Sequence, residues 1–308
     1  MILNPASAAG RTGRNREGIL EAIERGIGSS FTLYETRRAL DATEAARAAV
    51  LAGADLIVAV GGDGTIQEVV NGMLESGRPL RTGCELGIIR AGTGCGFADS
   101  FGLPPGLAAQ CAALGNGTAR SVDVGLASFS RPARKPGKRY FINECQAGLG
   151  GEVVKRVRSG NKKLGGLLVF GLKTLAVSLT YPNRRMDVAL DGGAAVSGPF
   201  LGIIAANGNS MAGGMRLAPA ARIDDGLLDV LLMHGQSVRG RLADFPKIYS
   251  GRHIGSPDFT CVRARVVEIG SDEDVSFEAD GELLGGLPVR VEVLPGALRV
   301  RSASPAKG

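Results

Sequence analysis

Hydrophobic positions follow two patterns that meet near residue 120. In the first part, short apolar runs alternate with helical patterns. Residues 55–60 form a short run rich in β-branched side chains, which is typical of a buried parallel strand. Ile66, Val69 and Met73 then recur at helical spacing. This order of strand, short loop and helix predicts an α/β fold with a parallel sheet.

The second pattern consists of short alternating runs separated by glycines and polar turns, which predicts an antiparallel β-rich domain. We expect strands at residues 121–125, 139–143, 186–190, 199–206, 226–233, 262–269, 275–279 and 289–293. One helical segment, residues 164–179, interrupts them. Its 16 residues include Lys173 and are too few to span a membrane, which leaves core packing or contact with lipid as its role.

The length of 308 residues favours two domains. We predict an α/β Rossmann-like nucleotide-binding domain at residues 1–120 and a β-rich sandwich domain at residues 121–293. Residues 294–308 are expected to return to the first domain.

Between the buried strand and its helix lies the sequence Gly61-Gly62-Asp63-Gly64-Thr65. Glycines let backbone N–H groups close on a phosphate, and the following helix adds the positive end of its dipole. A carboxylate within such a loop would repel the phosphate unless a cation lay between them, so Asp63 indicates a nucleotide with Mg²⁺. An ordinary βα turn with a solvated Asp63 is the alternative.

Composition excludes several classes of protein. Five cysteines without a CxxC pair, and only two histidines, indicate neither a disulfide framework nor a zinc site, and favour reduced thiols in the cytoplasm. The N-terminus has no charged segment followed by an apolar one, so we do not expect secretion. Both histidines are expected to be structural.

Positive charge is concentrated in the middle of the chain. Lys and Arg number 11 against 12 Asp and Glu in residues 1–120, 13 against 5 in residues 121–200, and 12 against 13 in residues 201–308. The middle segment therefore carries a local excess of eight, which favours an anionic surface over a merely solvated face. The chain has no tryptophan and only 5% aromatic residues, so it offers few side chains on which the bases of a nucleic acid could stack. We expect a membrane surface as partner and no nucleic acid.

The GGDGT sequence resembles the signature of the soluble lipid kinases, which include bacterial diacylglycerol kinases, YegS-like proteins, and sphingosine and ceramide kinases. NAD kinases and, more distantly, phosphofructokinases share it. Further motifs resemble the lipid kinases in order along the chain: an Asn-Pro-x-Ser loop at residues 4–7, Thr36 at a strand end, and Gly92-Thr93. The resemblance implies that ATP contacts Asn4, Pro5, Ser7, Thr36, Gly61, Gly62, Asp63, Gly64, Thr65, Gln67, Gly92 and Thr93.

The chain departs from the family pattern at two places. In the first loop, Ala8 replaces the family's glycine. Where these kinases have Gly-Thr-x-Asn-Asp-Phe-Ala, this sequence has Cys95-Gly96 in place of Asn-Asp. The loss of an amide and a carboxylate changes the hydrogen bonds that the site can make. It affects the prediction of the phosphate acceptor more than the prediction of nucleotide binding.

Two motifs in the second domain carry further implications of the resemblance. The run at residues 207–230 resembles the family's metal loop, which implies that Asp225 and the carbonyls of Arg222 and Leu227 hold Mg²⁺. An Asp-Gly hairpin turn is the alternative. Asp280-Gly281-Glu282 resembles the family's Asp-Gly-Glu. If this segment is extended, both carboxylates point to one face, and one of them can act as the general base. A plain turn at Asp280-Gly281 is the alternative.

The sequence is thus identified as a suspected lipid kinase that transfers phosphate from ATP to a hydroxyl of a membrane lipid such as diacylglycerol or ceramide. Asp63, Asp280 and Glu282 are the predicted catalytic residues, and ATP and Mg²⁺ the predicted cofactors. Peripheral membrane association in the cytoplasm is expected, and a homodimer is left open. The alternatives are an NAD kinase, suggested by Asn143-Glu144, and a non-catalytic lipid- or nucleotide-binding protein.

Overall fold

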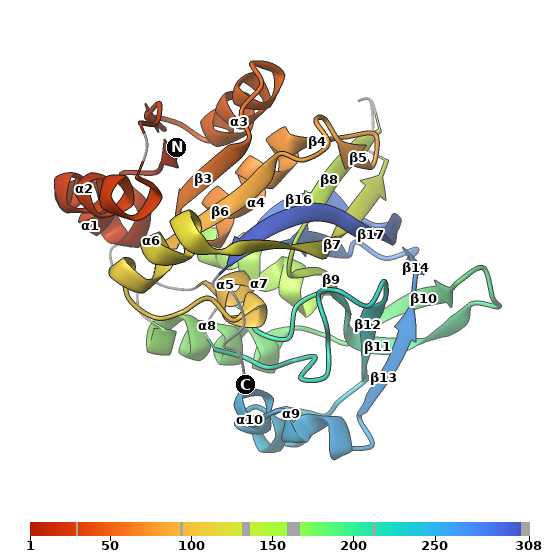
Figure 1. The fold of residues 1–308 in the computed structure, drawn as a ribbon. Coiled ribbons are helices and arrows are strands. Elements are labelled where there is room, and N and C mark those ends of the chain that lie inside the picture. Colours follow the sequence, from red (N-terminus) through yellow and green to blue (C-terminus); the bar gives the residue numbers. More distant parts are fainter. Residues whose placement is uncertain (29, 93–94, 131–135, 159–166, 212–213, 303–308) are drawn as a thin grey trace, which may run out of the picture. The chain divides into compact units, whose positions relative to one another are not determined.

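The chain folds into two compact units, which are described separately. The first comprises Met1–Asp123 and Gly296–Gly308, and the second comprises Val124–Pro295. The computed structural model describes residues 1–28, 30–92, 95–130, 136–158, 167–211 and 214–302 (Figure 1).

The first unit contains a parallel sheet. Its strands are β1 (Ile2–Leu3), β2 (Tyr34–Glu35), β3 (Leu56–Gly61), β6 (Glu85–Arg90) and the end of β17 (Val289–Ser302). They lie in the order β17-β6-β3-β1-β2, and every pairing is parallel. The chain runs from β1 outward to β2 and then back past β1 to β3. The order therefore reverses beside β1, which is where open α/β sheets bind ligands.

Helices cover this sheet on both faces because its strands are apolar on both sides. Val58 and Val60 of β3 pack with side chains of α2 (Arg16–Ile27) and α6 (Leu107–Asn116). Helix α3 (Asp41–Leu51) packs against α4 (Asp63–Met73), which follows β3 directly. Shorter elements complete the unit: η1 (Ser7–Gly10), α1 (Arg11–Arg14), α5 (Gly96–Phe101) and the ribbon of β4 (Leu74–Glu75) and β5 (Arg78–Pro79).

The second unit is built on antiparallel strands. These are β7 (Thr118–Phe129), β8 (Gly137–Phe141), β9 (Glu144–Gly148), β10 (Arg184–Leu190), β11 (Val196–Ala206), β12 (Leu228–His234), β13 (Phe259–Ala264), β14 (Val266–Gly270), β15 (Ser276–Ala279), β16 (Glu282–Gly286) and the first part of β17. The long strand β11 pairs with β9, β10 and β12. Inward side chains such as Phe141, Phe200 and Phe277 form the core, each at most 1% exposed.

Helices of the second unit pack on a separate apolar cluster. They are α7 (Leu149–Arg158), α8 (Leu167–Thr180), α9 (Val238–Asp244) and α10 (Lys247–Ser250), followed by η2 (Arg252–Gly255). Val153 of α7, Val177 of α8 and Ile248 of α10 are buried in this cluster with side chains of β11 and β12. None of the helices in the described ranges is long and apolar enough to cross a membrane.

The predicted elements mostly exist, with corrections at their limits. The expected strand at residues 262–269 is two strands, because the chain breaks its pairing at Arg265 between β13 and β14. Strands β9 and β16 were not predicted, since Glu144–Gly148 and Glu282–Gly286 lack β-branched residues. The expected helix 164–179 corresponds to α8, and residues 164–166 lie outside the described ranges.

Close packing of α3 on α4 generates a stability prediction. A Cβ placed on Gly72 of α4 would lie 2.3 Å from the Thr43 carbonyl oxygen and 2.8 Å from the Ala46 Cβ. Gly72→Ala is expected to lower the free energy of unfolding by about 1–3 kcal/mol through overpacking. Gly64→Ala on the same helix is the control, because no described atom lies within 4 Å of its Cβ position. Equal denaturation midpoints for the two variants would contradict this close contact.

Candidate functional site

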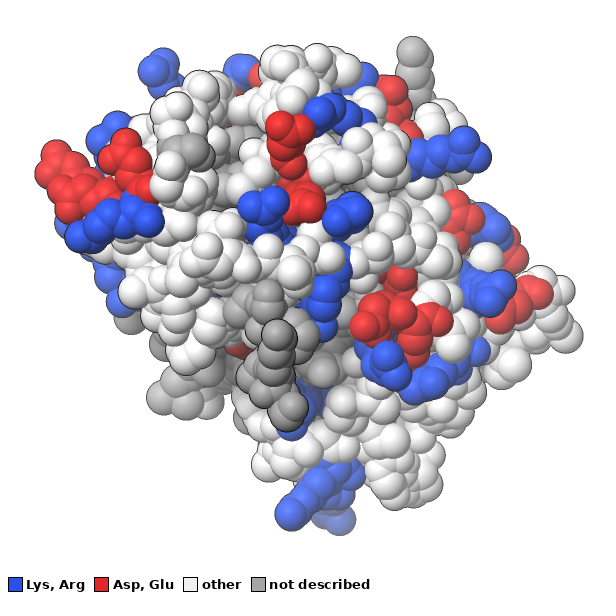
Figure 2. Space-filling view, viewed as in Figure 1, with Lys and Arg blue, Asp and Glu red and all other residues white. Residues whose placement is uncertain are grey.

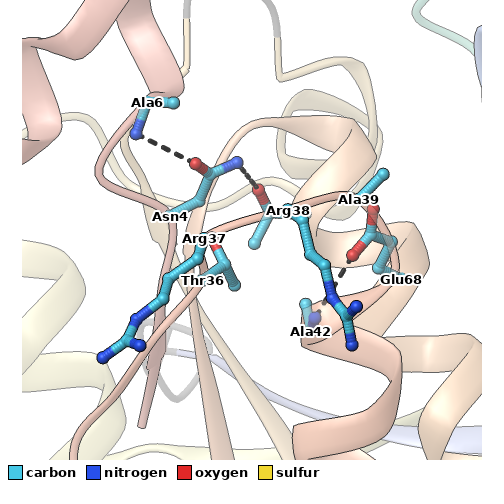
Figure 3. A pocket seen from close by; sticks show the side chains of 9 residues that line it. Asn4, Ala6, Thr36, Arg37, Arg38, Ala39, Ala42 and Glu68 are labelled. Carbon is cyan, nitrogen blue, oxygen red and sulfur yellow. Dashed lines mark hydrogen bonds between the residues drawn. The ribbon is translucent and has the colours of Figure 1, made fainter.

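A polar cavity of about 280 Å³ lies at the carboxyl ends of the parallel strands of the first unit (Figure 3). Its lining comes from the loop after β1, the loop after β2, and helices α3 and α4. The lining residues are Asn4, Ala6, Thr36, Arg37, Arg38, Ala39, Ala42, Thr65 and Glu68. This is the position beside β1 where the strand order reverses, so fold and cavity indicate the same binding region.

Asn4 joins two walls of this cavity. Its Nδ2 donates to Thr65 Oγ1 at 3.0 Å, and its Oδ1 accepts from the Ala6 N–H at 3.0 Å (Figure 3). The amide thereby ties the loop after β1 to the first turn of α4. Thr36 follows β2, and its N–H donates to the Leu3 carbonyl. The predicted residues Asn4, Thr36 and Thr65 therefore line one cavity.

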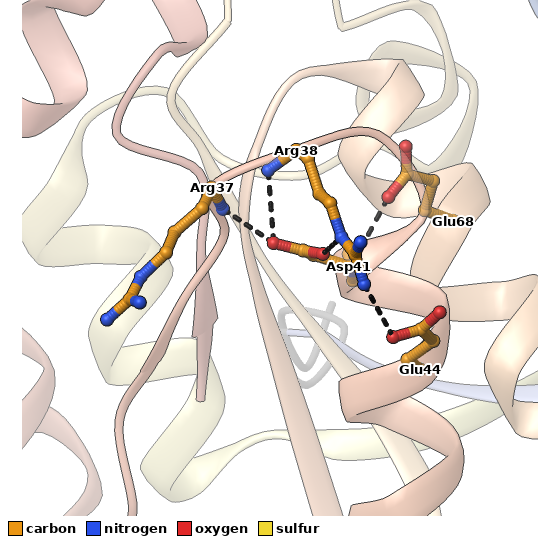
Figure 4. Close-up of polar contacts among 6 residues, drawn as sticks. Arg37, Arg38, Asp41, Glu44 and Glu68 are labelled. Carbon is orange, nitrogen blue, oxygen red and sulfur yellow. Dashed lines mark hydrogen bonds and ion pairs between the residues drawn. The ribbon is translucent and has the colours of Figure 1, made fainter.

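Asp41 shapes the loop on the other side. The buried carboxylate accepts from the N–H groups of Arg37 at 2.7 Å and Arg38 at 3.0 Å, and these bonds lower its pKa (Figure 4). It also accepts from Arg38 Nε at 2.9 Å, and the Arg38 guanidinium contacts Glu44 at 3.6 Å. Figure 4 shows the Arg37 side chain extending away from this group. The Asp41 carboxylate thus fixes this loop, and Asp41 is also the first residue of helix α3.

Glu68 was not predicted from the sequence. Its Oε2 accepts from the Ala42 N–H at 3.3 Å, across the cavity wall formed by α3 and α4 (Figures 3 and 4). Glu68 is one helical turn beyond Thr65, so both face the cavity. A carboxylate at this position can accept hydrogen bonds from the hydroxyl or amino groups of a ligand.

The glycine loop is shorter than predicted, because α4 already begins at Asp63. Gly61 ends β3, and a Cβ there would lie 2.4 Å from Thr65 Oγ1. Gly62 is the N-cap of α4, and Gly64 has open space beside it. Gln67 is buried within α4 and does not line the cavity.

Asp63 fastens α4 to α5. Its Oδ2 accepts from the Gly96 N–H at 3.0 Å, and its Oδ1 accepts from the Phe97 N–H at 3.3 Å. The carboxylate therefore binds the first N–H groups of α5, where a negative charge is favoured. Burial nevertheless raises the pKa of Asp63 to about 6, against the lowering effect of these bonds. A nearby cation would relieve the cost of this buried charge.

A second cavity of about 520 Å³ in the first unit is basic. Arg11, Arg14 and Arg90 line it together with Gly92, and Thr93 lies outside the described residues. Ser7 does not line either cavity. Its hydroxyl donates to Thr12 Oγ1 at 2.6 Å, and Thr12 donates to the Ala91 carbonyl at 2.9 Å. This relay holds the loop after β1 against the end of β6.

In the second unit, the expectation that Asp280 and Glu282 share an extended segment is wrong. Asp280 and Gly281 have φ values of +46° and +78° and form the two-residue turn between β15 and β16. Positive φ at both positions is the geometry that Asp-Gly favours in tight hairpins. The two carboxylates therefore take different directions.

Asp280 binds backbone amides. Its Oδ2 accepts from the Ile142 N–H at 2.7 Å, and its Oδ1 accepts from those of Asn143 at 2.9 Å and Glu144 at 3.1 Å. Asn207 holds the same turn, because its Nδ2 donates to the Ile142 carbonyl at 2.8 Å. Three sequence motifs that are far apart in the chain thus meet at the turn between β8 and β9.

Glu282 lies at the start of β16 and pairs with Arg139 of β8. The contact from Glu282 Oε2 to Arg139 Nη2 is 2.6 Å. The side chains are 29% and 13% exposed, so the glutamate is reachable from solvent whereas the arginine is largely covered. Arg139 was counted among the basic residues of the sequence but was not predicted as a partner of Glu282. Of the motif's two carboxylates, only Glu282 is free of the backbone bonds that engage Asp280.

The predicted metal loop is not a hairpin, since 21 residues connect β11 to β12. Asp225 is half-buried, and its Oδ1 accepts from the Leu227 N–H at 3.2 Å. Burial raises the pKa of nearby Asp229, and the charge of Asp225 adds to this increase. No cluster of three or more His, Cys, Asp or Glu able to hold a metal occurs among the residues described. One carboxylate with the carbonyls of Arg222 and Leu227 is nevertheless an oxygen donor set of the kind Mg²⁺ prefers.

Both histidines contact oxygen atoms of the second unit. His253 is fully buried with its Nε2 at 2.9 Å from the Leu217 carbonyl oxygen, and burial lowers its pKa. His234 contacts Thr260 Oγ1 at 2.8 Å. All five cysteines are free thiols, and burial raises the pKa of Cys95, which stands in the family's Asn position.

Two family profiles match successive parts of the chain. Residues 1–127 match the family profile described as diacylglycerol kinase catalytic domain, and residues 144–302 match the YegS C-terminal NAD kinase beta sandwich-like domain. The diacylglycerol kinase of Bacillus subtilis is 30% identical over 293 residues, covering 94% of this chain and 90% of that protein. That of Staphylococcus carnosus is 30% identical over 292 residues, covering 94% and 89%.

Solved structures share the fold. A crystal structure of a Bacillus anthracis protein has a TM-score of 0.77 and 24% identity, covering 98% of this chain and 93% of that one. A crystal structure of a diacylglycerol kinase from the same species has a TM-score of 0.70 and 22% identity, covering 98% and 95%. The fold and the sequence matches together define a kinase with a parallel-sheet unit and a β-sandwich unit. The chain belongs to the diacylglycerol kinase family, and this assignment favours the lipid kinase prediction over the NAD kinase alternative.

The raised pKa of Asp63 generates a prediction on pH dependence. The folded protein binds a proton at this carboxyl more tightly than the unfolded chain does, because the pKa is about 6 in the folded state and ordinarily 3.8. The contribution of protonated Asp63 to the free energy of unfolding is therefore complete below about pH 4, and it is lost as the pH rises through about 6. At about 1.4 kcal/mol per pKa unit, the stability difference between wild type and Asp63→Asn should change by up to about 3 kcal/mol.

Denaturant unfolding between about pH 4 and pH 7 measures this difference. Asp55→Asn serves as the control, because the Asp55 side chain is 88% exposed. Parallel stability curves for wild type and Asp63→Asn would contradict the buried-charge assignment.

Proposed function

We propose that this protein is an ATP-dependent kinase that phosphorylates a hydroxyl group of a membrane lipid. The observation that carries the proposal is the polar cavity at the carboxyl ends of β1 and β2, in a chain of the diacylglycerol kinase family. Proteins named diacylglycerol kinase are similar over 94% of this chain. Diacylglycerol is therefore the first acceptor to test, followed by ceramide and sphingoid bases.

Nucleotide binding is assigned to the first unit. Thr36, Thr65 and Glu68 offer hydroxyl and carboxylate oxygens in the cavity, which suits the hydroxyl and amino groups of a nucleoside. The N-terminus of α4, which begins at Asp63, favours the negative charge of the phosphates. Arg11, Arg14 and Arg90 add positive charge in the second cavity. The loop residues Pro5, Gly61, Gly62 and Gly64 act through their backbone.

Mg²⁺ fits two places. Asp63 is a buried carboxylate with a raised pKa, so a cation beside it would lower the cost of its charge. Asp225 with the carbonyls of Arg222 and Leu227 supplies oxygen donors for a second ion. A Mg²⁺ ion held by these oxygens would supply positive charge to offset the negative charge of a phosphate. Both assignments are part of the proposal.

Glu282 is the proposed general base. The acceptor hydroxyl is a poor nucleophile until its proton is removed, and carboxylates can accept that proton. Asp280 already accepts three backbone hydrogen bonds, whereas Glu282 makes one side-chain ion pair and is partly exposed. Arg139 holds Glu282 in place through that pair. We therefore assign Asp280 a positioning role at the β8–β9 turn.

The experiment that tests the function uses labelled ATP with diacylglycerol, ceramide, sphingosine and a glycerophospholipid in mixed micelles. NAD serves as an additional acceptor. We expect label on one of the lipids. Label on NAD alone, or on none of these acceptors, would overturn the proposal.

Glu68→Ala tests the nucleotide cavity. Losing a charged acceptor is expected to weaken ATP binding about tenfold or more, since such a hydrogen bond contributes about 1.5–3 kcal/mol. Glu75→Ala is the matched control, because Glu75 pairs with Arg47 at 2.7 Å and neither residue lines the cavity. Titration calorimetry measures both. Equal ATP affinities for the two variants would place the nucleotide elsewhere.

Glu282→Gln tests the base. Turnover is expected to fall about 10²–10⁴-fold while ATP affinity stays close to that of wild type. Glu268→Gln is the control, because Glu268 also pairs with an arginine, at 3.1 Å from Arg290, but lies outside the motif. Asp280→Asn should instead lower the thermal midpoint, because an amide cannot replace a carboxylate that accepts three N–H groups. Normal turnover of Glu282→Gln would rule out this base.

Membrane association is also proposed. The basic excess of residues 121–200 motivates it, although Arg131, Arg134, Lys135, Lys162 and Lys163 lie outside the described residues. The described part of this segment includes Lys155 and Arg156 of α7, and Arg156 already pairs with Glu152 at 2.6 Å. A homodimer stays an open alternative for the protein in solution.

A further inference from the structure

Exposed apolar side chains gather on three helices of the second unit. The described part of the chain exposes eight large hydrophobic side chains, and four of them lie on α8, α9 and α10. They are Leu172, Val238, Leu242 and Tyr249, which are 58%, 50%, 49% and 36% exposed. Single exposed hydrophobic residues are ordinary, but half of these eight lie on three helices that contain 14, 7 and 4 residues, and this concentration requires an explanation.

The three helices are joined by side-chain contacts. Arg241 of α9 donates through Nη1 to the carbonyls of Ser178, in α8, and of Tyr181, just after it, the latter at 2.6 Å. A Cβ on Gly171 of α8 would lie 2.5 Å from the Tyr249 hydroxyl, so α10 also touches α8 next to Leu172. The four exposed side chains therefore belong to one packed group of helices. We call Leu172, Val238, Leu242 and Tyr249 the docking face.

On α9, the two exposed side chains share one side of the helix. Val238 and Leu242 are four residues apart, which places them one above the other. The helix is fixed in orientation, because Ser237 Oγ caps it by accepting from the Gly240 N–H at 3.2 Å and Arg241 is buried beneath it. On α9, the apolar side chains of Val238 and Leu242 are therefore exposed, whereas the charged side chain of Arg241 is buried.

Charge around the docking face has a single sign. Helix α8 contains no Asp or Glu, and residues 237–257 contain only Asp244. Asp244 is 4% exposed and accepts from Lys247 Nζ at 2.7 Å. Arg239 and Arg252 are exposed on the same segment. In Figure 2 the region of α9 and α10 shows white and blue atoms and no red ones.

We propose that the docking face binds an anionic lipid bilayer, with Val238, Leu242 and Tyr249 entering the interface and Arg239 and Arg252 contacting lipid headgroups. Short amphipathic helices with apolar and basic side chains bind membranes in this way. The absence of exposed carboxylates among the described residues of these helices favours an anionic bilayer over a second copy of this chain. The proposal rests on the proposed function, because a lipid acceptor resides in such a bilayer.

The assignment goes beyond the basic clusters of the sequence. Those clusters lie at residues 131–163, whereas α9, α10 and η2 together carry only four Lys and Arg side chains, of which Arg241 is internal. Attraction by charge alone would not require exposed Val238 and Leu242. The docking face therefore predicts binding that depends on apolar and basic side chains together.

Vesicle sedimentation with the full chain tests the proposal. The vesicles are phosphatidylcholine alone or a mixture with one quarter phosphatidylglycerol. Val238→Glu/Leu242→Glu should lower partitioning onto the mixed vesicles about tenfold or more, because two apolar contacts are lost and two negative charges added. Arg239→Glu/Arg252→Glu should lower it by about the same factor, and only on the anionic vesicles.

Matched controls separate the docking face from general exposure. Leu51 and Val196 are 66% and 57% exposed outside these helices, so Leu51→Glu/Val196→Glu should partition as wild type does. Turnover on a water-soluble short-chain diacylglycerol should be unchanged in all three double variants. A wild-type protein that turns over this lipid without binding vesicles would overturn the docking face and leave the kinase proposal intact.

Two further outcomes separate the docking-face proposal from the kinase proposal and from a dimer interface. Loss of vesicle binding in the docking-face variants, with no kinase activity in wild type, would support the docking face and overturn the proposed function. Sedimentation velocity then tests a second copy as the occupant. A wild-type dimer that becomes monomeric in Val238→Glu/Leu242→Glu, with vesicle binding unchanged, would overturn the proposal.

Discussion

The arrangement of the second unit depends on one carboxylate that is bound by backbone N–H groups. Asp280 sits in a tight turn and accepts from three consecutive residues of the turn between β8 and β9. Hydrogen bonds between backbone donors and a carboxylate are strong, and an unpaired buried N–H is costly. This contact orients β16, and with it Glu282, toward Arg139 on β8. In the structure, Asp280 thus holds the turn next to Glu282 through backbone hydrogen bonds.

Much of the fold follows from local pattern. The run at residues 55–60 is rich in apolar and β-branched side chains, and the structure has a strand at Leu56–Gly61. Strands β9 and β16 escaped prediction because their sequences are polar or glycine-rich. They exist because tertiary pairing with β11 and β15 outweighs local preference.

The site residues that belong to short local motifs could be predicted from the sequence. Asn4, Thr36 and Thr65 line one cavity as the motifs suggested, whereas Glu68 follows Thr65 by one helical turn and could have been found from that spacing. Arg139 could not be found in this way, because its pairing with Glu282 joins residues 143 positions apart. The direction of Asp280 was missed because a two-residue turn replaces the extended segment that alternation requires.

The return of the chain to its first unit has a consequence for the order of synthesis. Arg299 and Val300 of β17 pair with Glu85 and Leu86 of β6, although about 210 residues separate them. Arg301 also binds Glu85 at 2.7 Å. During translation, β6 is therefore an edge strand without its neighbour until the whole second unit has left the ribosome. A chaperone that shields open sheet edges would act in this interval.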